Sequence, residues 1–510
     1  MKKRLSLSIE TLWAATVLIG VFAFANTHPL RPHDFWFHAA VGREIVSTGE
    51  IPEVDTFSYT AAGQPYDSYK SFWLMEVLLY TLYTWGGAVG VVFVHGLMIT
   101  AAYVVTFVAG WRASRSVRAG ALGALFAAAL GINDWNVRPQ AIAFVIGALF
   151  LWAIDALQYG GRRAWLLVFP LGMLVWVNSH GSFVMGLALL GAWFAANMVS
   201  VFRARFYETA QAPVARQQRP REVSSLYSSG LALTLASLAC LLNPRGLGVL
   251  RYVGGMAANP VIQNMVPEWA APGLDTLGGR LFYIGLSFAL LLLLFSLRRS
   301  RVFQWLVFLG FAALGLQTMR GSVWFGLFLA PTVAFHLAGI GKNLVKRFPP
   351  HPDEKPAPPV LNGIILAFLL LLGFVSLPWF KESLPFPPPK AGLISYETPV
   401  RATQVLLEND WPGYVFHAMS FGSYLDWAAQ PEYPVFVDSR IELYPVSVWQ
   451  DYIEISAALA GWEDELAAYG VNTLMLSPFE QAGLVAAVRV SAHWQLVYED
   501  TAALVFVRQP

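Results

Sequence analysis

The amino-acid sequence predicts a mostly α-helical membrane protein with about eleven transmembrane helices and a small C-terminal α/β domain. Of its 510 residues, 56% are hydrophobic and only 13% are charged, whereas a soluble domain has about 25% charged residues. Long apolar runs follow one another up to residue 379, and after it the composition changes to that of a soluble domain. These observations argue against a soluble enzyme with a large core.

The transmembrane spans are predicted from apolar runs that approach about 20 residues, the length that crosses the hydrocarbon of a bilayer. They lie at 10–26, 88–111, 117–132, 139–157, 164–179, 181–201, 226–243, 280–297, 302–318, 321–340 and 360–379. The first run follows MKKR, but no small-residue cleavage site closes it, so we expect an uncleaved span. The run at 72–85 is short and contains Glu76, so we expect a juxtamembrane helix along the membrane surface.

Basic residues predict the orientation of the chain in the membrane. With the N-terminus inside and 72–85 not crossing, most Lys and Arg residues fall on the cytoplasmic side, as the positive-inside rule requires. The C-terminal domain is then periplasmic or extracellular. A net charge of +2 gives no support for nucleic acid as a partner. The single cysteine, Cys240, excludes an internal disulfide.

Three parts are predicted along the chain. Residues 1–379 form the transmembrane domain, whose first outer loop spans about 27–87, and residues 380–390 form a linker too rich in proline for a helix or strand. Residues 391–510 form the outer α/β domain, because apolar strand-like and amphipathic helix-like segments alternate there. Its predicted strands are 433–439, 472–478 and 502–508, and its predicted helices are 446–459, 463–470 and 480–490.

The first outer loop begins with a polar segment, RPHDFWFHAAVGREI (31–45), that contains His33, Asp34 and His38. If a helix begins at residue 35, Asp34 and His38 are four residues apart and share one helix face. This spacing fits a metal site with His33 and His38 as ligands, or a carboxylate–imidazole pair. The structural alternative is a solvated helix end that Asp34 caps.

Arginines stand isolated among apolar residues at three outer helix ends: Arg138, Arg245 and Arg320. The planar guanidinium matches the geometry of phosphate, so the three are predicted to converge as a phosphate clamp. The alternative is an interfacial arginine that binds lipid headgroups. His180 and Glu268 are predicted to line the same cavity, the alternatives being a hydrogen-bonded turn and an exposed loop carboxylate.

The outer domain contains a second charged group, FVDSRIELY (436–444), with Asp438, Arg440 and Glu442. A structural salt bridge is one interpretation, and polar groups directed toward the membrane cavity are the other. The sequence contains no P-loop, GxSxG, HExxH or dinucleotide-binding motif.

Eight segments carry a likeness to a known class. In chain order they are HDFWFHAAVGREIVSTGEIPEVDTFSYTAAGQPY, SFWLMEVLLY, VRPQ, VNSHGSFVMGL, LNPRGL, PEW, MRGS and VFVDSRIELY. Together they resemble the GT-C-type polytopic glycosyltransferases, and within these the bacterial proteins grouped as RgtA/B/C/D-like. The resemblance covers most of the chain.

The resemblance implies an inverting glycosyltransferase with Asp34 as its catalytic carboxylate. Its donor would be a sugar linked to polyprenyl phosphate, which reaches the enzyme from the surrounding membrane lipids. The sugar would be transferred to a cell-envelope acceptor on the outer face of a bacterial inner (cytoplasmic) membrane. A carboxylate can serve as the base, and the arginines would stabilise the leaving phosphate. His33 stands where the class has a nearby second acid, so a divalent metal and a metal-free reaction both stay open.

Two alternatives of other classes remain. The first is a non-catalytic accessory or assembly subunit with the same fold and with protein partners in a membrane complex, which the missing second acid favours. The second is a transporter, for which broken helices and charges at the membrane midplane would be expected, and the sequence shows neither clearly.

Overall fold

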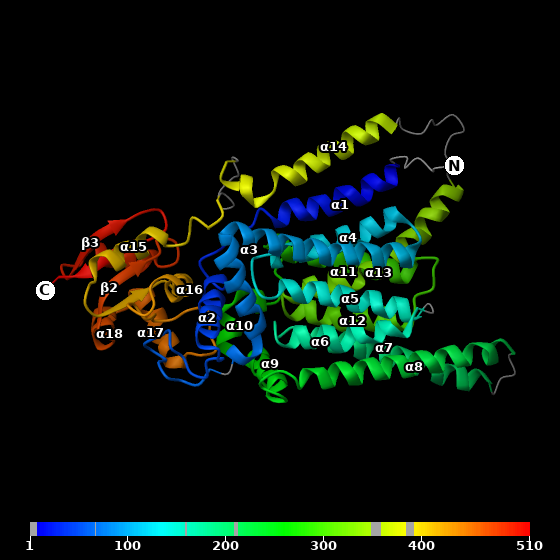
Figure 1. The fold of residues 1–510 in the computed structure, drawn as a ribbon, viewed down its shortest axis with the longest axis horizontal. Coiled ribbons are helices and arrows are strands. Elements are labelled where there is room, and N and C mark those ends of the chain that lie inside the picture. The colour runs from blue at the N-terminus through cyan, green and yellow to red at the C-terminus, as the bar shows by residue number, and fades with distance from the viewer. Residues whose placement is uncertain are drawn as a thin grey trace.

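The computed structural model describes residues 8–66, 68–158, 161–208, 213–347, 359–383 and 392–509. Its helices form a long bundle, and a smaller domain that contains a sheet packs at one end, here named the domain end (Figure 1). The bundle helices are α1 (Ile9–Ala25), α3 (Tyr69–Ser114), α4 (Val117–Gly131), α5 (Ala141–Gln158), α6 (Val168–Val177), α7 (Phe183–Glu208), α8 (Pro213–Cys240), α11 (Leu277–Phe295), α12 (Val302–Gln317), α13 (Gly321–Arg347) and α14 (Pro359–Val375).

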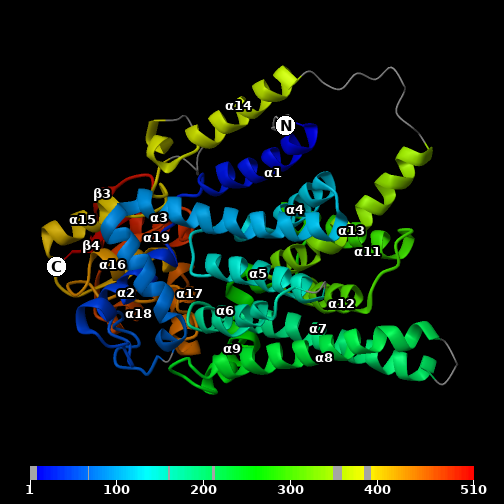
Figure 2. The ribbon, with the colours of Figure 1, turned by 45° about the vertical axis from the view of Figure 1, so that its right-hand side comes forward.

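Each predicted span coincides with one of these helices. Within the described residues, six helices are long and apolar enough to cross a membrane, and four shorter ones are apolar as well. The prediction of a mostly helical, polytopic membrane protein is therefore confirmed. Helices α1 and α14, far apart in sequence, lie side by side along one edge of the bundle (Figure 2).

Helix α3 is two helices joined at a sharp break. Gly87 has φ 56° and ψ −161°, a backbone conformation that glycine adopts without steric cost. The part before Gly87 packs against α2 (Phe35–Thr48) at the domain end, and the part after it runs along the bundle (Figure 2). The break separates the segment predicted to lie along the membrane surface from the span predicted to follow it.

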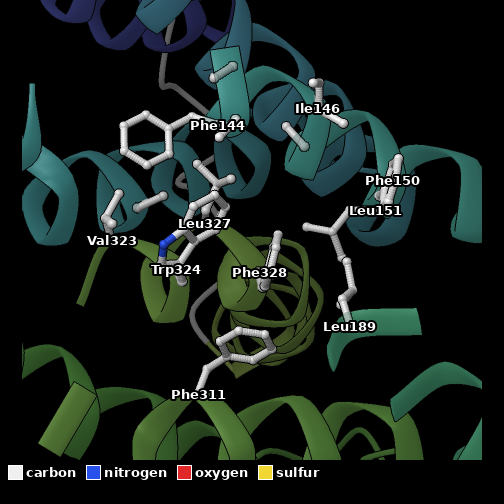
Figure 3. Packing of buried hydrophobic residues seen from close by; sticks show 14 of the residues in the cluster. Phe144, Ile146, Phe150, Leu151, Leu189, Phe311, Val323, Trp324, Leu327 and Phe328 are labelled. Carbon is white, nitrogen blue, oxygen red and sulfur yellow. The ribbon is translucent and has the colours of Figure 1, made fainter. Parts of the chain in front are cut away.

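The core of the bundle combines close backbone contacts with aromatic packing around α13. A Cβ atom on Gly123 of α4 would lie 2.6 Å from the carbonyl oxygen of Ala330 on α13, so small residues let these two helices approach. On the opposite side of α13, the Trp324 ring lies 5.3 Å from that of Phe144 and 5.4 Å from that of Phe328 (Figure 3). This packing fixes the helix ends from which the candidate site is built.

The C-terminal domain has a four-stranded sheet in the order β1-β2-β4-β3. Strand β1 (Tyr414–His417) is parallel to β2 (Val471–Leu476), whereas β4 (Leu504–Arg508) is antiparallel to both β2 and β3 (Trp494–Glu499). The helices of the domain are α15 (Val400–Asn409), α16 (Met419–Ala428), α17 (Val446–Ser456), α18 (Trp462–Ala468) and α19 (Ala482–Val490). The predicted α/β domain is confirmed, with β2 and β4 at two of the predicted strands.

The predicted strand at 433–439 was wrong. This segment is buried and extended, but it pairs with the first loop of the chain instead of the sheet. The Val435 N–H donates to the Phe57 carbonyl at 2.9 Å, and the Tyr59 N–H donates to the Val435 carbonyl at 3.1 Å. The apolar run at 435–437 therefore reflects burial between the domain and the first loop, which form one packed unit.

Candidate functional site

Two adjoining cavities lie at the domain end of the bundle. The polar cavity has a volume of about 130 Å³, and its ionisable and amide-bearing lining residues are Asp34, His38, Tyr66, Glu76, Arg138, Gln140, His180, Tyr252, Arg320, Arg440 and Glu442. The apolar cavity has a volume of about 580 Å³ and is lined mainly by apolar side chains, among them Val184, Met185, Val253, Leu314 and Trp324. Both cavities share Phe72, Gln140, His180, Met256 and Arg320.

Asp34 enters the polar cavity from a tight turn just before α2. Its φ of 62° and ψ of −71°, with the Phe35 N–H donating to the His33 carbonyl at 2.9 Å, form a γ-turn of the rare positive-φ kind. Strained backbone of this type is often found at functional sites. The Asp34 side chain makes no capping bond to the described start of α2. Instead, its Oδ2 lies 2.6 Å from Nε of Arg138.

Arg138 and Arg320 meet on one carboxylate, that of Glu268. Arg138 precedes α5, Arg320 precedes α13, and Glu268 lies in the short helix η3 (Pro267–Trp269). Nη1 of Arg138 donates to both Glu268 carboxylate oxygens at 2.7 Å, and Nε and Nη2 of Arg320 donate to Oε2 at 2.9 and 2.8 Å. The Arg320 N–H also donates to the Glu268 carbonyl at 3.1 Å. Side-chain and backbone hydrogen bonds thus both hold Arg320 against Glu268.

These ion pairs determine the charge of the site. Burial alone would raise the pKa of the Asp34 carboxyl, but Arg138, His33 and His38 hold that pKa well below its usual range. Burial opposes ionisation of Glu268 too, and the two guanidiniums lower its pKa to about 2. Both carboxylates are therefore ionised near neutral pH, and their two charges balance those of the two arginines.

Asp134, in the loop after α4, behaves in the opposite way. Burial, and then the negative charge of Glu268, raise its pKa to about 7. Its Oδ2 is buried without a hydrogen-bond partner among the described residues. Asp134 therefore changes its charge near neutral pH, whereas Asp34 and Glu268 stay ionised there.

His180 lies in the turn between α6 and α7 and lines both cavities. The Ser182 N–H donates to its Nδ1 at 3.1 Å, which assigns the ring proton to Nε2. Burial, followed by the charge of Arg320, lowers the pKa of His180 to about 3. His180 is therefore a neutral imidazole that acts as a donor through Nε2.

The third predicted arginine does not join the other two. Among the described residues that line either cavity, Arg245 is absent. Its guanidinium lies 4.5 Å from the centre of the Tyr252 ring, so it supports the wall that Tyr252 provides. Of the three arginines predicted to form the clamp, the structure brings Arg138 and Arg320 together.

The predicted metal pair does not form either. Within the described part of the chain, no group of three or more His, Cys, Asp or Glu side chains is arranged to hold a metal ion. The His38 ring instead pairs with α3, where its Nδ1 lies 3.2 Å from Oε1 of Glu76.

The C-terminal domain closes the polar cavity through Glu442. Its Oε1 accepts hydrogen bonds from the hydroxyls of Tyr66 at 2.9 Å, Tyr252 at 3.0 Å and Ser68 at 3.2 Å. The four residues come from three distant parts of the chain, so their meeting could not be read from the sequence. The only signal for Glu442 was its place in FVDSRIELY.

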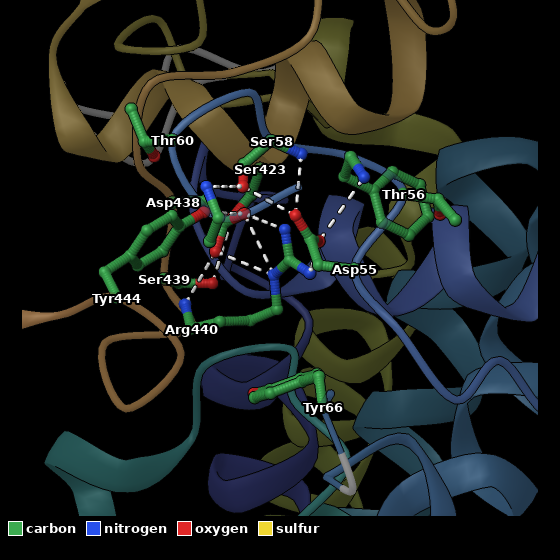
Figure 4. Close-up of polar contacts among 12 residues, drawn as sticks. Asp55, Thr56, Ser58, Thr60, Tyr66, Ser423, Asp438, Ser439, Arg440 and Tyr444 are labelled. Atoms are coloured by element: carbon green, nitrogen blue, oxygen red, sulfur yellow. Dashed lines mark hydrogen bonds and ion pairs between the residues drawn. The ribbon is translucent and has the colours of Figure 1, made fainter. Parts of the chain in front are cut away.

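Arg440 attaches this domain to the first loop and to α3. Its Nε donates to both carboxylate oxygens of Asp438 at 3.0 and 2.9 Å, and its Nη1 donates to Asp55 (Figure 4). The same Nη1 donates to the Tyr69 hydroxyl at 2.7 Å. The side chains of Arg440, Asp55 and Asp438 are almost completely buried. The structural salt bridge is present, and it joins two parts of the molecule.

Comparisons with known proteins show a likeness of fold to solved structures. No protein-family model matches the chain, and a search of curated proteins finds no match. Neither result supports the narrower RgtA/B/C/D-like grouping. Among solved structures, the chain is similar to ArnT from Cupriavidus metallidurans bound to undecaprenyl phosphate, with a TM-score of 0.46 and 13% sequence identity over 97% of each chain.

Proposed function

We propose that this protein is a glycosyltransferase that moves a sugar from polyprenyl phosphate to a hydroxyl group of a cell-envelope acceptor. The proposed reaction takes place at the outer face of a bacterial inner membrane, with the domain end outside. One observation carries the proposal: Arg138 and Arg320 share Glu268 where the polar cavity meets the apolar cavity. A polyprenyl phosphate is a phosphate on a long apolar chain, and this junction offers a place for each part.

The two guanidiniums suit a phosphate that leaves during the reaction. A guanidinium has five N–H donors, and the bonds to carboxylates use Nε and Nη1 of Arg138 and Nε and Nη2 of Arg320. The third nitrogen of each group is not used by these bonds. Donors that are already oriented stabilise the negative charge that develops on the phosphate. Asp34 and Glu268 provide that orientation.

The cavities match the two ends of such a donor in character. The apolar cavity, at about 580 Å³, has the size of an ordinary small-molecule site and would hold the first prenyl units. In the polar cavity, Gln140, His180 and Tyr252 offer hydrogen bonds to the hydroxyls of the sugar.

The proposed reaction is a single displacement. The acceptor oxygen attacks the anomeric carbon on the side opposite the phosphate, while the bond from that carbon to the phosphate oxygen breaks. The phosphate leaves with the electron pair, and the anomeric configuration inverts. The acceptor hydroxyl must lose its proton to a base, and the polar cavity offers Asp34 and His38 for this task.

The second candidate is a non-catalytic subunit of a membrane complex. The ion pair between Asp34 and Arg138 favours it, because a carboxylate engaged in this way is a poor base. Such a subunit would bind polyprenyl phosphate without turning over a donor.

The test uses full-length protein in lipid nanodiscs with a panel of synthetic polyprenyl-phosphate monosaccharides and a cell-envelope lipid extract as acceptor. Mass spectrometry measures the release of polyprenyl phosphate and the glycosylated product. We expect release from at least one donor, abolished by Arg138→Gln and retained by Arg245→Gln. No release from any donor would contradict the proposal, and binding of undecaprenyl phosphate without turnover would support the non-catalytic subunit.

A further inference from the structure

We infer that His38, held by Glu76, is the base that takes the proton from the acceptor hydroxyl. This inference rests on the proposed glycosyl transfer and names the group that completes it. His38 is the catalytic residue, because it would touch the reacting hydroxyl, and Glu76 is a positioning residue that acts through it.

The geometry of the pair leaves one imidazole nitrogen available to the cavity. His38 lies in the first turn of α2, and its Nδ1 is 3.2 Å from Oε1 of Glu76 on α3. Burial raises the pKa of the Glu76 carboxyl, and the hydrogen bond from His38 opposes that shift. In its ionised form the carboxylate only accepts hydrogen bonds, so Nδ1 then carries the proton and Nε2 keeps its lone pair. The Glu76 side chain is 1% exposed and that of His38 is 14% exposed, and both line the polar cavity. A buried carboxylate behind an imidazole that faces the cavity is an arrangement that fixes tautomer and orientation.

The other imidazole of the site has the opposite tautomer. Nδ1 of His180 accepts the Ser182 N–H at 3.1 Å, so its Nε2 carries a proton and cannot accept another while the ring is neutral. The Phe72 ring lies 6.1 Å from the His38 ring and 6.0 Å from the His180 ring. The site therefore has one imidazole that accepts a proton and one that donates a hydrogen bond, and both lie near the same aromatic ring.

Asp34 is the weaker base of the two candidates. Its Oδ2 is 2.6 Å from Nε of Arg138, and this cation stabilises the ionised carboxylate, which lowers its tendency to take up a proton. A general base works best when its conjugate acid has a pKa near the ambient pH, and imidazole is the side chain that meets this condition most often.

A glycine on α2 makes the pairing of His38 with Glu76 possible. Gly42 lies one turn after His38, and a Cβ atom at this position would come within 2.1 Å of the Glu76 carbonyl oxygen and 2.8 Å of Cβ of Tyr80. Only glycine permits this approach of α2 to α3. The backbone contact therefore sets the distance across which Nδ1 reaches the carboxylate.

Charged and titratable groups surround His38 from every neighbouring element, and they would shape its pH dependence. Those that share the polar cavity with it are Asp34, Tyr66, Glu76, Arg138, His180, Tyr252, Arg320, Arg440 and Glu442. Positive and negative groups are both present, and they act on His38 in opposite directions. The test therefore compares the pH–rate profiles of variants with that of the wild type.

The experiment measures kcat, KM and the pH–rate profile of the nanodisc-embedded full-length protein with the donor that the panel identifies. The variants are His38→Gln, Glu76→Gln and Asp34→Asn, with His493→Gln as the matched control, because His493 is exposed on the C-terminal domain. Binding of undecaprenyl phosphate is titrated in parallel to show that each variant keeps its lipid site.

We expect His38→Gln to lower kcat at least about 100-fold, while the affinity for undecaprenyl phosphate changes less than about 3-fold. The loss of activity toward acidic pH, where the imidazole is protonated, should disappear from its residual rate. Glu76→Gln should lower kcat less and move the acidic limb of the profile. His38→Ala should regain activity when imidazole is added, and this rescue keeps the test valid if His38→Gln folds poorly.

Two results would overturn the inference in different ways. If His38→Gln keeps kcat and the acidic limb while Asp34→Asn abolishes transfer, Asp34 is the base. If the wild-type protein transfers no sugar from any donor, the proposed function fails and the inference fails with it.

Discussion

Nε of Arg138 lies 2.6 Å from Oδ2 of Asp34, and the same guanidinium bonds both carboxylate oxygens of Glu268. This ion pair fastens the start of α2 to the start of α5. In the proposed function, Asp34 orients the guanidinium that would bind the phosphate, a task that the sequence did not indicate. The ion pair also makes Asp34 a poor proton acceptor.

The first prediction concerns the arginine pair. Arg138→Gln should weaken binding of undecaprenyl phosphate about 10- to 100-fold, because a charge-assisted bond to phosphate is lost. Arg245→Gln is the control and should change affinity little, since its guanidinium rests on the Tyr252 ring outside both cavities. Titration in nanodiscs measures both, and an equal loss in the two variants would contradict a two-arginine site.

A second prediction concerns Gly42. An alanine here must force α2 away from α3, since its Cβ would meet the Glu76 carbonyl at 2.1 Å, and overpacking of this kind costs about 1–3 kcal/mol. We expect a lower unfolding temperature together with reduced transfer. Gly20→Ala in α1 is the matched control, because no heavy atom lies within 4 Å of its added Cβ. Equal behaviour of the two variants would show that the helix approach is not tight.

The attachment of the C-terminal domain gives a third prediction. Arg440→Ala leaves the buried carboxylates of Asp55 and Asp438 without their cation, a loss that typically costs about 3–5 kcal/mol. We expect a lower unfolding temperature and faster proteolysis of the first loop. Arg489→Ala removes an exposed ion pair and should have little effect. Unchanged protease resistance in Arg440→Ala would contradict the docking role.

The fourth prediction is a pH dependence of stability from Asp134. Its pKa of about 7 lies above the value of 3.8 for an unperturbed carboxyl, so the folded protein binds more protons than the unfolded chain between these values. This contribution to stability is present at low pH and is lost as the pH rises through about 7.

Asp134→Asn should remove that loss. At pH 8 we expect the variant to be more stable than the wild type by at least about 1 kcal/mol, with a smaller difference at pH 5. Unfolding temperatures in detergent between pH 5 and pH 8 measure this difference in stability. The exposed Asp275→Asn is the control. A variant that is less stable at pH 8 would show that the ionised carboxylate has a stabilising partner.

Much of the helical framework could be predicted because the bilayer imposes length and apolarity on each span. Arg138, Arg320, His180 and Glu268 stood out for a related reason, since ionisable residues among apolar ones at helix ends are costly to retain. The pairing among them could not be predicted. Glu268 is 130 residues from Arg138, and nothing near Arg245 in sequence distinguishes it from the arginines that meet.

The domain end was less predictable because its packing is decided by distant partners. The segment 433–439 has the apolar, β-branched and aromatic composition of a strand, yet Val435 bonds to Phe57 in the first loop. Strands β1 and β3 were missed because β1 has only four residues and β3 is largely exposed. The pairing of His38 with Glu76 depends on a close helix approach, of which Gly42 is the only local trace.

The most direct test of the central claim is a cryo-electron microscopy structure of the full-length protein in nanodiscs with undecaprenyl phosphate. We predict the phosphate within hydrogen-bond distance, about 2.7–3.2 Å, of the guanidiniums of both Arg138 and Arg320, with the first prenyl units in the apolar cavity. A phosphate bound away from both arginines, or at the opposite end of the bundle, would contradict the claim.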